Sequence, residues 1–329
     1  MGIDFTGGNL FMVLLLFAAG LLCIIKGGDL FVDAASWIAE ASGIPKFIIG
    51  ATVVSFATTM PEMLVSVFAA LQGNADIAVG NAVGSVTANV GLIMCVALIC
   101  MECAMTRKQF GVKACLLLAA ILALFGFTRD GQLSVLESVL ILVIFVGFLV
   151  ESLIAARQEQ GSELPAQEER PKIDKKTVLL NIGKFLLGAA GIVLGAQLLI
   201  DNGSALARML GVPDAVIAAT MIAIGTSLPE LVTTLTAIKK KQASLSVGNI
   251  IGANIMDLTL IMPLCAVIQG KPMTVERQGM LLDIPACLII CAAALIPALV
   301  QGKFKRWIGY LIGGLYIAYL IIMFTCFGA

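Results

Sequence analysis

Histidine is absent from this 329-residue chain, and charged residues make up only 13% of it. The lack of histidine removes the usual proton shuttle near neutral pH and the commonest ligand of transition metals. Basic and acidic residues number 21 each, so no net charge favours nucleic acid as a partner. The first apolar run, Leu10–Ile25, has no basic residue before it, unlike a secretory signal peptide. We therefore expect this run to be a retained first helix.

Cysteine chemistry is also not expected. Most of the nine cysteines lie inside apolar stretches, where cysteine serves as a small apolar filler. Cys100 and Cys103 have the C-x-x-C spacing, but no histidine and no second such pair accompanies them. The sequence therefore predicts no zinc site, no thiol redox centre and no cofactor.

Hydrophobic residues, by contrast, make up 60% of the chain, and the mean hydropathy is +1.03. This composition indicates an integral membrane protein, with the lipid bilayer as its surroundings. Runs of about 17–26 apolar residues are long enough to cross the bilayer core as helices. They predict an all-α membrane protein with ten transmembrane helices, near residues 9–25, 45–71, 76–100, 112–128, 133–154, 178–200, 214–238, 243–268, 280–299 and 307–326.

One segment occurs twice. Residues 27–99 and 195–267 align without a gap, and about three in ten paired positions are identical. The alignment places Glu62 opposite Glu230 inside apolar stretches. A duplication that repeats an ionisable residue in a membrane span predicts a two-fold binding site.

The repeat divides the chain into a first half at 1–157, a linker at 158–176 and a second half at 177–329. The linker is rich in charge and proline, which is typical of a connecting segment. Each half holds five spans, an odd number, so the two halves must cross the membrane in opposite orientations. Inverted repeats of this kind let one mid-membrane site be reached alternately from either side.

The distribution of basic residues predicts the orientation. Cytoplasmic loops carry an excess of lysine and arginine. If both termini lie outside and the linker lies in the cytoplasm, the cytoplasmic loops hold all of the 21 basic residues except Arg129, Arg208, Lys271 and Arg277. We therefore expect a multi-pass protein of the cell membrane, of prokaryotic type, with that orientation.

Three acidic residues fall inside the predicted spans: Glu62, Glu230 and Asp257, the last of which pairs with Asn89 in the repeat. A charged carboxylate at the centre of the bilayer costs about 2.5–3.5 kcal/mol on insertion scales. No lysine or arginine is within reach in these stretches. A bound cation is the economical compensation, and protonation is the alternative.

Oxygen-bearing side chains accompany these acids at helical spacing. Thr58 and Glu62 are four residues apart, as are Ser85 and Asn89, so each pair shares a helix face. Taken singly, such residues often join membrane helices by hydrogen bonds. As a duplicated set around two carboxylates they predict a shell for a hard cation. The set also includes Ser55, Thr59, Thr226 and Ser227.

A proline precedes each glutamate. Pro61 and Pro229 lack an N–H group, so they free the carbonyls of Ala57 and Gly225 and kink the helix. Free carbonyls at membrane depth are tolerated where they line a cavity, and there they can bind an ion.

The charges favour calcium as one of the ions. Ca²⁺ takes six to eight oxygen ligands, and two glutamates neutralise it. Several Na⁺ ions can occupy the same oxygens at sub-sites that share the glutamates. Competition for shared carboxylates is sufficient for exchange of one ion for the other.

At these residues the chain resembles the cation/calcium exchangers, in particular the prokaryotic sodium/calcium antiporters, over essentially its full length. The sequence G-T-S-x-P-E stands at 225–230, and G-N-x-x-G-[SA]-N-x-x-[ND] stands at 248–257. The first copy departs from this pattern: Ala57 begins its Pro-Glu motif, and Val86 replaces the second asparagine.

The resemblance implies exchange of three Na⁺ for one Ca²⁺ at the mid-membrane, with spans 1 and 6 sliding as a gate. It also implies the ligands: Ca²⁺ on Glu62, Glu230, Thr58 and Thr226; Na⁺ on Ser55, Thr59, Ser85, Ser227 and the carbonyl of Ala223; and Asn89 and Asp257 facing the central pocket. Ala253 stands where a serine ligand is common. The expected partners are Ca²⁺ and Na⁺, and no obligate protein partner is evident.

Several alternatives stay open at this point. Proton/calcium exchange is the nearest, because carboxylates alone can carry protons. Potassium-dependent exchange is another, and Asp257 does not decide it. A cation channel would not require an inverted repeat. An intramembrane enzyme is disfavoured, because Pro-Glu motifs stand where paired aspartates would be needed and a Ser–His dyad is impossible without histidine.

Overall fold

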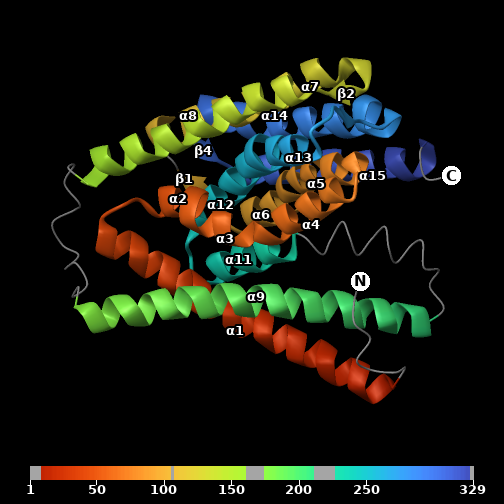
Figure 1. Ribbon diagram of the computed structural model, residues 1–329. Coiled ribbons are helices and arrows are strands. Elements are labelled where there is room, and N and C mark those ends of the chain that lie inside the picture. The colour runs from red at the N-terminus through yellow and green to blue at the C-terminus, as the bar shows by residue number, and fades with distance from the viewer. Residues whose placement is uncertain (1–8, 105–106, 161–173, 211–226, 327–329) are drawn as a thin grey trace.

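The computed structural model describes residues 9–104, 107–160, 174–210 and 227–326, and most of these residues are helical (Figure 1). The α-helices are α1 (Leu10–Ser42), α2 (Lys46–Ile49), α3 (Ser55–Thr58), α4 (Met60–Leu71), α5 (Ala75–Ala88), α6 (Cys95–Cys100), α7 (Arg107–Phe127), α8 (Val135–Gln160), α9 (Lys175–Met209), α11 (Leu228–Lys239), α12 (Ala243–Met256), α13 (Met262–Gln269), α14 (Ile284–Gln301) and α15 (Arg306–Cys326). Shorter helical segments are η1 (Gly50–Val54), η2 (Asn89–Met94), η3 (Thr128–Asp130), η4 (Asp257–Ile261) and η5 (Gly279–Asp283).

The chain is a helical membrane protein, as predicted. In the described part, eight helices are long and apolar enough to cross a membrane, and nine if the bent pair Lys46–Thr58 and Met60–Leu71 counts as one span. The expected span at 214–238 is described only from Ser227 onward, because residues 211–226 lie outside the described ranges. The first and sixth helices continue well past Gly27 and Gly195, to Ser42 and Met209.

Helices α1 and α9 cross along one side of the molecule, below the other helices in Figure 1. Glycines make this close approach possible. A Cβ atom added to Gly20 would lie 3.0 Å from the Gly195 carbonyl oxygen, and one added to Gly27 would lie 2.9 Å from the Gly188 carbonyl oxygen. The ungapped alignment pairs Gly27 with Gly195, and the same offset, continued before the aligned segments, pairs Gly20 with Gly188. The two contacts are therefore reciprocal between the halves.

The central helix is α12, the most deeply buried of the candidate spans. It packs against α2, η1 and α3 of the first half. A Cβ atom on Gly248 would lie 2.3 Å from the Phe47 carbonyl oxygen, and one on Gly252 would lie 2.2 Å from the Ala51 carbonyl oxygen. The G-x-x-x-G spacing therefore lets two backbones touch, which is its common structural role in membranes.

The remaining helices, α7, α8, α14 and α15, pack beside α5, α6 and α13. Two small antiparallel sheets of two-residue strands accompany the helices: β1 (Cys103–Ala104) pairs with β4 (Lys303–Phe304), and β2 (Gln132–Leu133) pairs with β3 (Met273–Thr274). Figure 1 shows the two sheets at opposite ends of the bundle. Each joins a connection of one half to a connection of the other, so the halves are paired at both ends.

Candidate ion-binding site

The second span is broken at Thr59, and proline chemistry explains the break. Pro61 has no N–H to donate to the Ala57 carbonyl, and its ring crowds the preceding turn. Thr59 leaves regular helical geometry, with φ −79° and ψ −5°, and the two parts of the span meet at 47°. In the other half, Ser227 precedes α11 and has nearly the same backbone angles as Thr59, φ −89° and ψ 3°. Pro229 is the second residue of α11. The predicted kink is therefore confirmed at Thr59.

Both of these helices carry a glutamate in their first turn. Glu62 is the third residue of α4, and Glu230 is the third residue of α11. The two side chains are 1% and 0% exposed, and their carboxyl groups lie close enough to interact with each other. None of the four carboxyl oxygens has a hydrogen-bond partner within the described ranges. The geometry thus brings together the two residues that the repeat singled out.

Asp257 adds a third acidic group to this region. It begins η4, is 1% exposed, and lies within electrostatic reach of Glu62 and Glu230. Its two carboxyl oxygens also lack hydrogen-bond partners in the described part of the chain. Among described residues, no lysine or arginine forms an ion pair with any of the three acids. The negative charge expected here therefore lacks a basic counterpart in this part of the protein.

Asn89 occupies the position equivalent to Asp257, and both residues open a π-helical segment. Short π-helical segments often occur at functional sites, because they shift the register of side chains and backbone groups. Asn89 is fully buried, and its Nδ2 donates to Asn254 Oδ1 across the halves at 3.0 Å. Its own Oδ1 has no described partner and remains available as a ligand.

The predicted hydroxyl ligands of the first half lie on α3, α5 and the break between α3 and α4. Thr58 Oγ1 lies within hydrogen-bond distance of two acceptors, Asn249 Oδ1 at 3.2 Å and the Ser55 carbonyl oxygen at 3.3 Å. The Ser55 hydroxyl donates to the Thr52 carbonyl at 3.1 Å. Ser85 is buried on α5, one turn before Asn89.

The second half is described less completely. Ser227 is buried, and its hydroxyl lacks a described partner. Ala223 and Thr226 lie outside the described residues, so their assignment stays a prediction. Gly225 and its carbonyl lie outside them as well.

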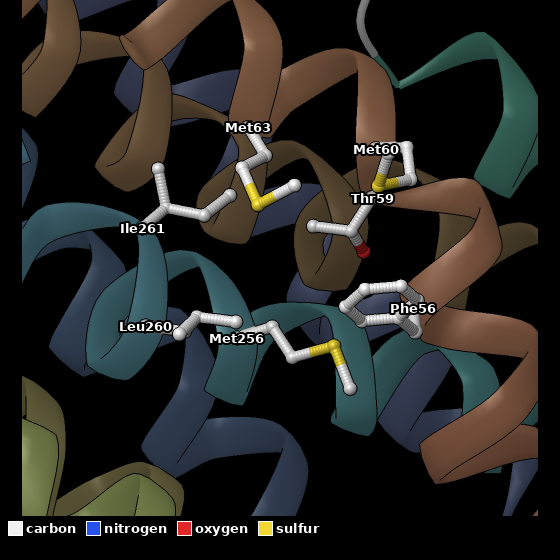
Figure 2. Close-up of a pocket in the computed structure, with 7 residues that line it drawn as sticks. All are labelled: Phe56, Thr59, Met60, Met63, Met256, Leu260 and Ile261. Carbon is white, nitrogen blue, oxygen red and sulfur yellow. The ribbon is translucent and has the colours of Figure 1, made fainter. Parts of the chain in front are cut away.

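The hydroxyl of Thr59 lies at a small crevice beside the break (Figure 2). The crevice has a volume of about 10 Å³, near the minimum needed to hold one water molecule. Its other walls are apolar and are formed by Phe56, Met60, Met63, Met256, Leu260 and Ile261. Thioethers are poor ligands for hard cations, so this crevice borders the ion site and does not form it.

The donor set suits a cation held mainly by oxygen. Among the described residues, no three Asp, Glu, Cys or His side chains are grouped closely enough to hold a metal ion by themselves. Two carboxylates therefore need hydroxyl, amide and backbone oxygens to complete a shell. Alkali and alkaline-earth cations take such mixed oxygen ligands.

The sequence interpretation missed two asparagines of the quoted motifs. Asn81 Nδ2 donates to the Glu62 carbonyl oxygen at 3.3 Å and to Ser66 Oγ at 2.9 Å. Asn249 is its repeat equivalent and accepts from Thr58. Their identity in both copies was the signal that could have identified them.

Comparison with known proteins supports the resemblance. A family model described as "Sodium/calcium exchanger protein" matches residues 12–154 and 180–325. The sodium/calcium exchanger MaX1 of Methanosarcina acetivorans is 30% identical, over 95% of this chain and 98% of its own. The inner membrane protein YrbG of Escherichia coli K12 is 31% identical, over 94% of this chain and 96% of its own. A solved structure of the sodium-calcium exchanger NCX_Mj, soaked with Na⁺ and Sr²⁺, superposes with a TM-score of 0.81 at 27% identity, over 95% of this chain and 98% of that one.

Proposed function

The chain belongs to the sodium/calcium exchanger family, and we propose that it exchanges Na⁺ for Ca²⁺ across a cell membrane at the site around Glu62 and Glu230. The observation that carries this proposal is the pair of neighbouring, buried carboxyl groups without a basic partner in the described residues. Two adjacent carboxylates at this depth repel one another and lack water, and a bound cation offsets both costs.

The ion that fits the pair best is Ca²⁺. Its two charges match the two glutamates, and its oxygen ligands lie at about 2.3–2.6 Å in flexible arrangements. Thr58 and the Ala57 carbonyl, which Pro61 frees, are the next ligands on the first half. Thr226 and the Gly225 carbonyl are the proposed counterparts on the second half.

Sodium would bind the same glutamates in smaller sub-sites. We assign these sub-sites to the glutamates together with Ser55, Thr59, Ser85, Ser227 and the carbonyl of Ala223, with Asn89 and Asp257 bordering the central pocket. The unpartnered hydroxyls of Thr59 and Ser227 support this assignment, because each is a buried oxygen available to a ligand. Ca²⁺ and Na⁺ then exclude one another, since the site has only one pair of glutamates.

Alternating access follows if the two halves are inverted repeats of five spans each, 1–157 and 177–329, joined by the linker 158–176. The reciprocal glycine contacts between α1 and α9 support such a two-fold relation. The excess of lysine and arginine in one set of loops supports an orientation with both termini outside and the linker inside.

We propose one cavity as an access route under this orientation. It has a volume of about 160 Å³ and lies between α5 and η5, with Val79, Gly80 and Val83 on one wall. Glu276 and Asp283 line the other wall, and their carboxylates favour entry of cations over anions. Asn81, adjacent in sequence to this wall, contacts the Glu62 backbone.

The test is uptake of ⁴⁵Ca²⁺ into proteoliposomes with one gradient imposed at a time. Vesicles loaded with Na⁺ should take up Ca²⁺ from Na⁺-free medium, and Glu230→Gln should reduce uptake to that of empty vesicles. Uptake that follows a pH gradient and ignores Na⁺ would replace the proposal with proton/calcium exchange. A requirement for K⁺ on one side would identify potassium-dependent exchange.

A further inference from the structure

We propose that Lys240, with Asp29 and Asp33, forms a latch that holds α1 against α11 and so keeps the cytoplasmic side of the protein closed. The inference rests on the proposed function and orientation, and it concerns residues outside the proposed set of ion ligands. A contact that favours one of two conformations sets how often each is populated. The latch would therefore decide how often the ion site faces each side of the membrane.

Helices α1 and α11 pack closely against each other. Gly28 of α1 faces α11, because a Cβ atom added to it would lie 2.7 Å from Thr236 Oγ1 and 3.1 Å from Val232 Cγ1. Helix α11 begins beside Glu230 and ends at Lys239, which is at the cytoplasmic surface in the proposed orientation. Helix α1 therefore covers the part of α11 that leads from the proposed ion site toward the cytoplasm.

One lysine just beyond the end of α11 joins the two helices by charge. Lys240 Nζ lies 2.6 Å from Asp33 Oδ1 and 3.6 Å from Asp29 Oδ1, and it donates to the Asp29 carbonyl oxygen at 3.0 Å. The side chains of Lys240 and Asp29 are 22% and 30% exposed, so water screens their contact less than that of a fully solvated pair. The neighbouring Lys239 is 71% exposed and reaches Asp29 Oδ1 only at 3.8 Å. Lys240 is therefore the residue that holds α1 to the end of α11.

The other half of the chain carries no matching latch in the described residues. In the ungapped alignment, Lys240 corresponds to Gln72, Asp29 to Gln197 and Asp33 to Asp201. Gln197 Nε2 donates to Asp201 Oδ1 along α9 at 2.9 Å. Within the described ranges, Asp201 forms no ion pair. The duplication therefore kept a charged contact on the cytoplasmic side and a neutral set of residues at the equivalent outer positions.

The packing around these positions differs in the same direction. The repeat counterparts of Val232 and Thr236 are Leu64 and Phe68 of α4. Leu64 and Phe68 are 48% and 58% exposed, whereas Val232 and Thr236 are half-buried. The described residues therefore show α1 closed onto α11, while the equivalent face of α4 is exposed. Because alternating access closes one side at a time, the latch belongs to the state in which the site faces outward.

Loss of the latch should shift the protein toward the state that is open to the cytoplasm. The apparent affinity measured from one side falls with the fraction of molecules that face the other side. Lys240→Ala should therefore lower the half-saturating Ca²⁺ concentration on the cytoplasmic side by about three- to tenfold and raise that on the outer side by a smaller factor. Uptake of ⁴⁵Ca²⁺ into inside-out and right-side-out membrane vesicles measures the two values. Lys239→Ala is the matched control and should change neither value by more than about twofold.

Two further variants separate a latch from a general effect of surface charge. Lys240→Ala combined with Asp33→Asn should stay within about twofold of Lys240→Ala alone, because both changes remove the same contact. Gln72→Lys places a lysine at the equivalent outer position, where Asp201 is available to it once the outer side closes. This variant should move the two half-saturating concentrations in the opposite direction to Lys240→Ala.

Hydrogen exchange of the purified full-length protein gives a readout that does not depend on transport. Lys240→Ala should speed amide exchange in residues 26–34 of α1 and 236–242 at the end of α11 by at least about threefold, and Lys239→Ala should not. Equal effects of Lys239→Ala and Lys240→Ala would overturn the latch, as would unchanged half-saturating concentrations in Lys240→Ala. Wild-type vesicles without Na⁺-driven Ca²⁺ uptake would overturn the proposed exchange, and the amide exchange would still decide whether Lys240 holds α1 to α11.

Discussion

At the scale of single residues, Glu62 and Glu230 are the most important, because each is a buried acid whose carboxyl oxygens have no hydrogen-bond partner among the described residues. Such groups destabilise a protein whenever nothing compensates them. The stability of the ion-free protein should therefore be limited by the same residues that we propose as ion ligands.

Glu230→Gln should raise the unfolding midpoint of the ion-free protein in detergent by a few degrees, since about 1 kcal/mol corresponds to roughly 2–4 °C in domains of 150–250 residues. The same variant should lose the further rise that Ca²⁺ gives to the wild type, because a ligand stabilises only a state that binds it. Thermal unfolding with and without Ca²⁺ measures both effects. An equal Ca²⁺-induced shift in the variant and the wild type would contradict the assignment.

The sequence identified the buried acidic residues, but it did not show which side chains contact their neighbours. A charged residue repeated inside two apolar spans is a strong signal, since its insertion cost is high. The contact between Thr58 and Asn249 could not be predicted, because spacing along one helix does not show which face of another helix it meets. Three of the expected positions, Ala223, Gly225 and Thr226, lie outside the described residues.

At the scale of elements, the break in the second span shapes the proposed site. Pro61 cannot donate to the Ala57 carbonyl at the end of α3, and α4 begins with Glu62 in its first turn. Carbonyl oxygens at the end of one half-helix are suitable ligands for a cation in a membrane. A continuous helix would use the same oxygens for its own hydrogen bonds.

Pro61→Ala should therefore weaken Ca²⁺ binding by about tenfold, equivalent to about 1.4 kcal/mol, because it supplies an N–H for the Ala57 carbonyl. Pro297→Ala is the matched control, since Pro297 lies inside α14 and outside the proposed ligand set. Binding of ⁴⁵Ca²⁺ to the two variants measures the difference. Equal affinity in Pro61→Ala and wild type would show that the break does not supply ligands.

The kink followed directly from the proline, but two other features of the elements did not follow from the sequence. The π-helical segments at Asn89 and Asp257 have no single-residue signature. The strands have only two residues each, too few for an alternating pattern to identify them. Their pairing depends on which loops meet after the helices have packed.

At the scale of the whole molecule, the repeat was the most informative part of the sequence. It predicted equivalent positions in the two halves, and the contacts of α1 with α9 agree with that correspondence. The long helices themselves were predictable from length and hydropathy. The ends of these helices were less predictable, because α1 and α9 extend beyond the apolar runs into polar residues.

The proposed orientation can be tested with trypsin, since Lys172 lies in the linker and is followed by Ile173, not by proline. Inside-out vesicles should yield two fragments of about half the chain each, because the linker is expected on the cytoplasmic side. Trypsin added to intact spheroplasts should not cut at Lys172 and so should not produce this pair of fragments. The opposite cleavage pattern would contradict the proposed orientation but not the proposed ion site.

The most direct measurement of the central claim is anomalous diffraction from crystals of this protein soaked with Sr²⁺, a heavier substitute for Ca²⁺. The account predicts one strong peak between the carboxylates of Glu62 and Glu230, with Thr58 among its ligands, and loss of that peak at high Na⁺. A strong peak at any other place, with these two carboxylates turned away from each other, would contradict it.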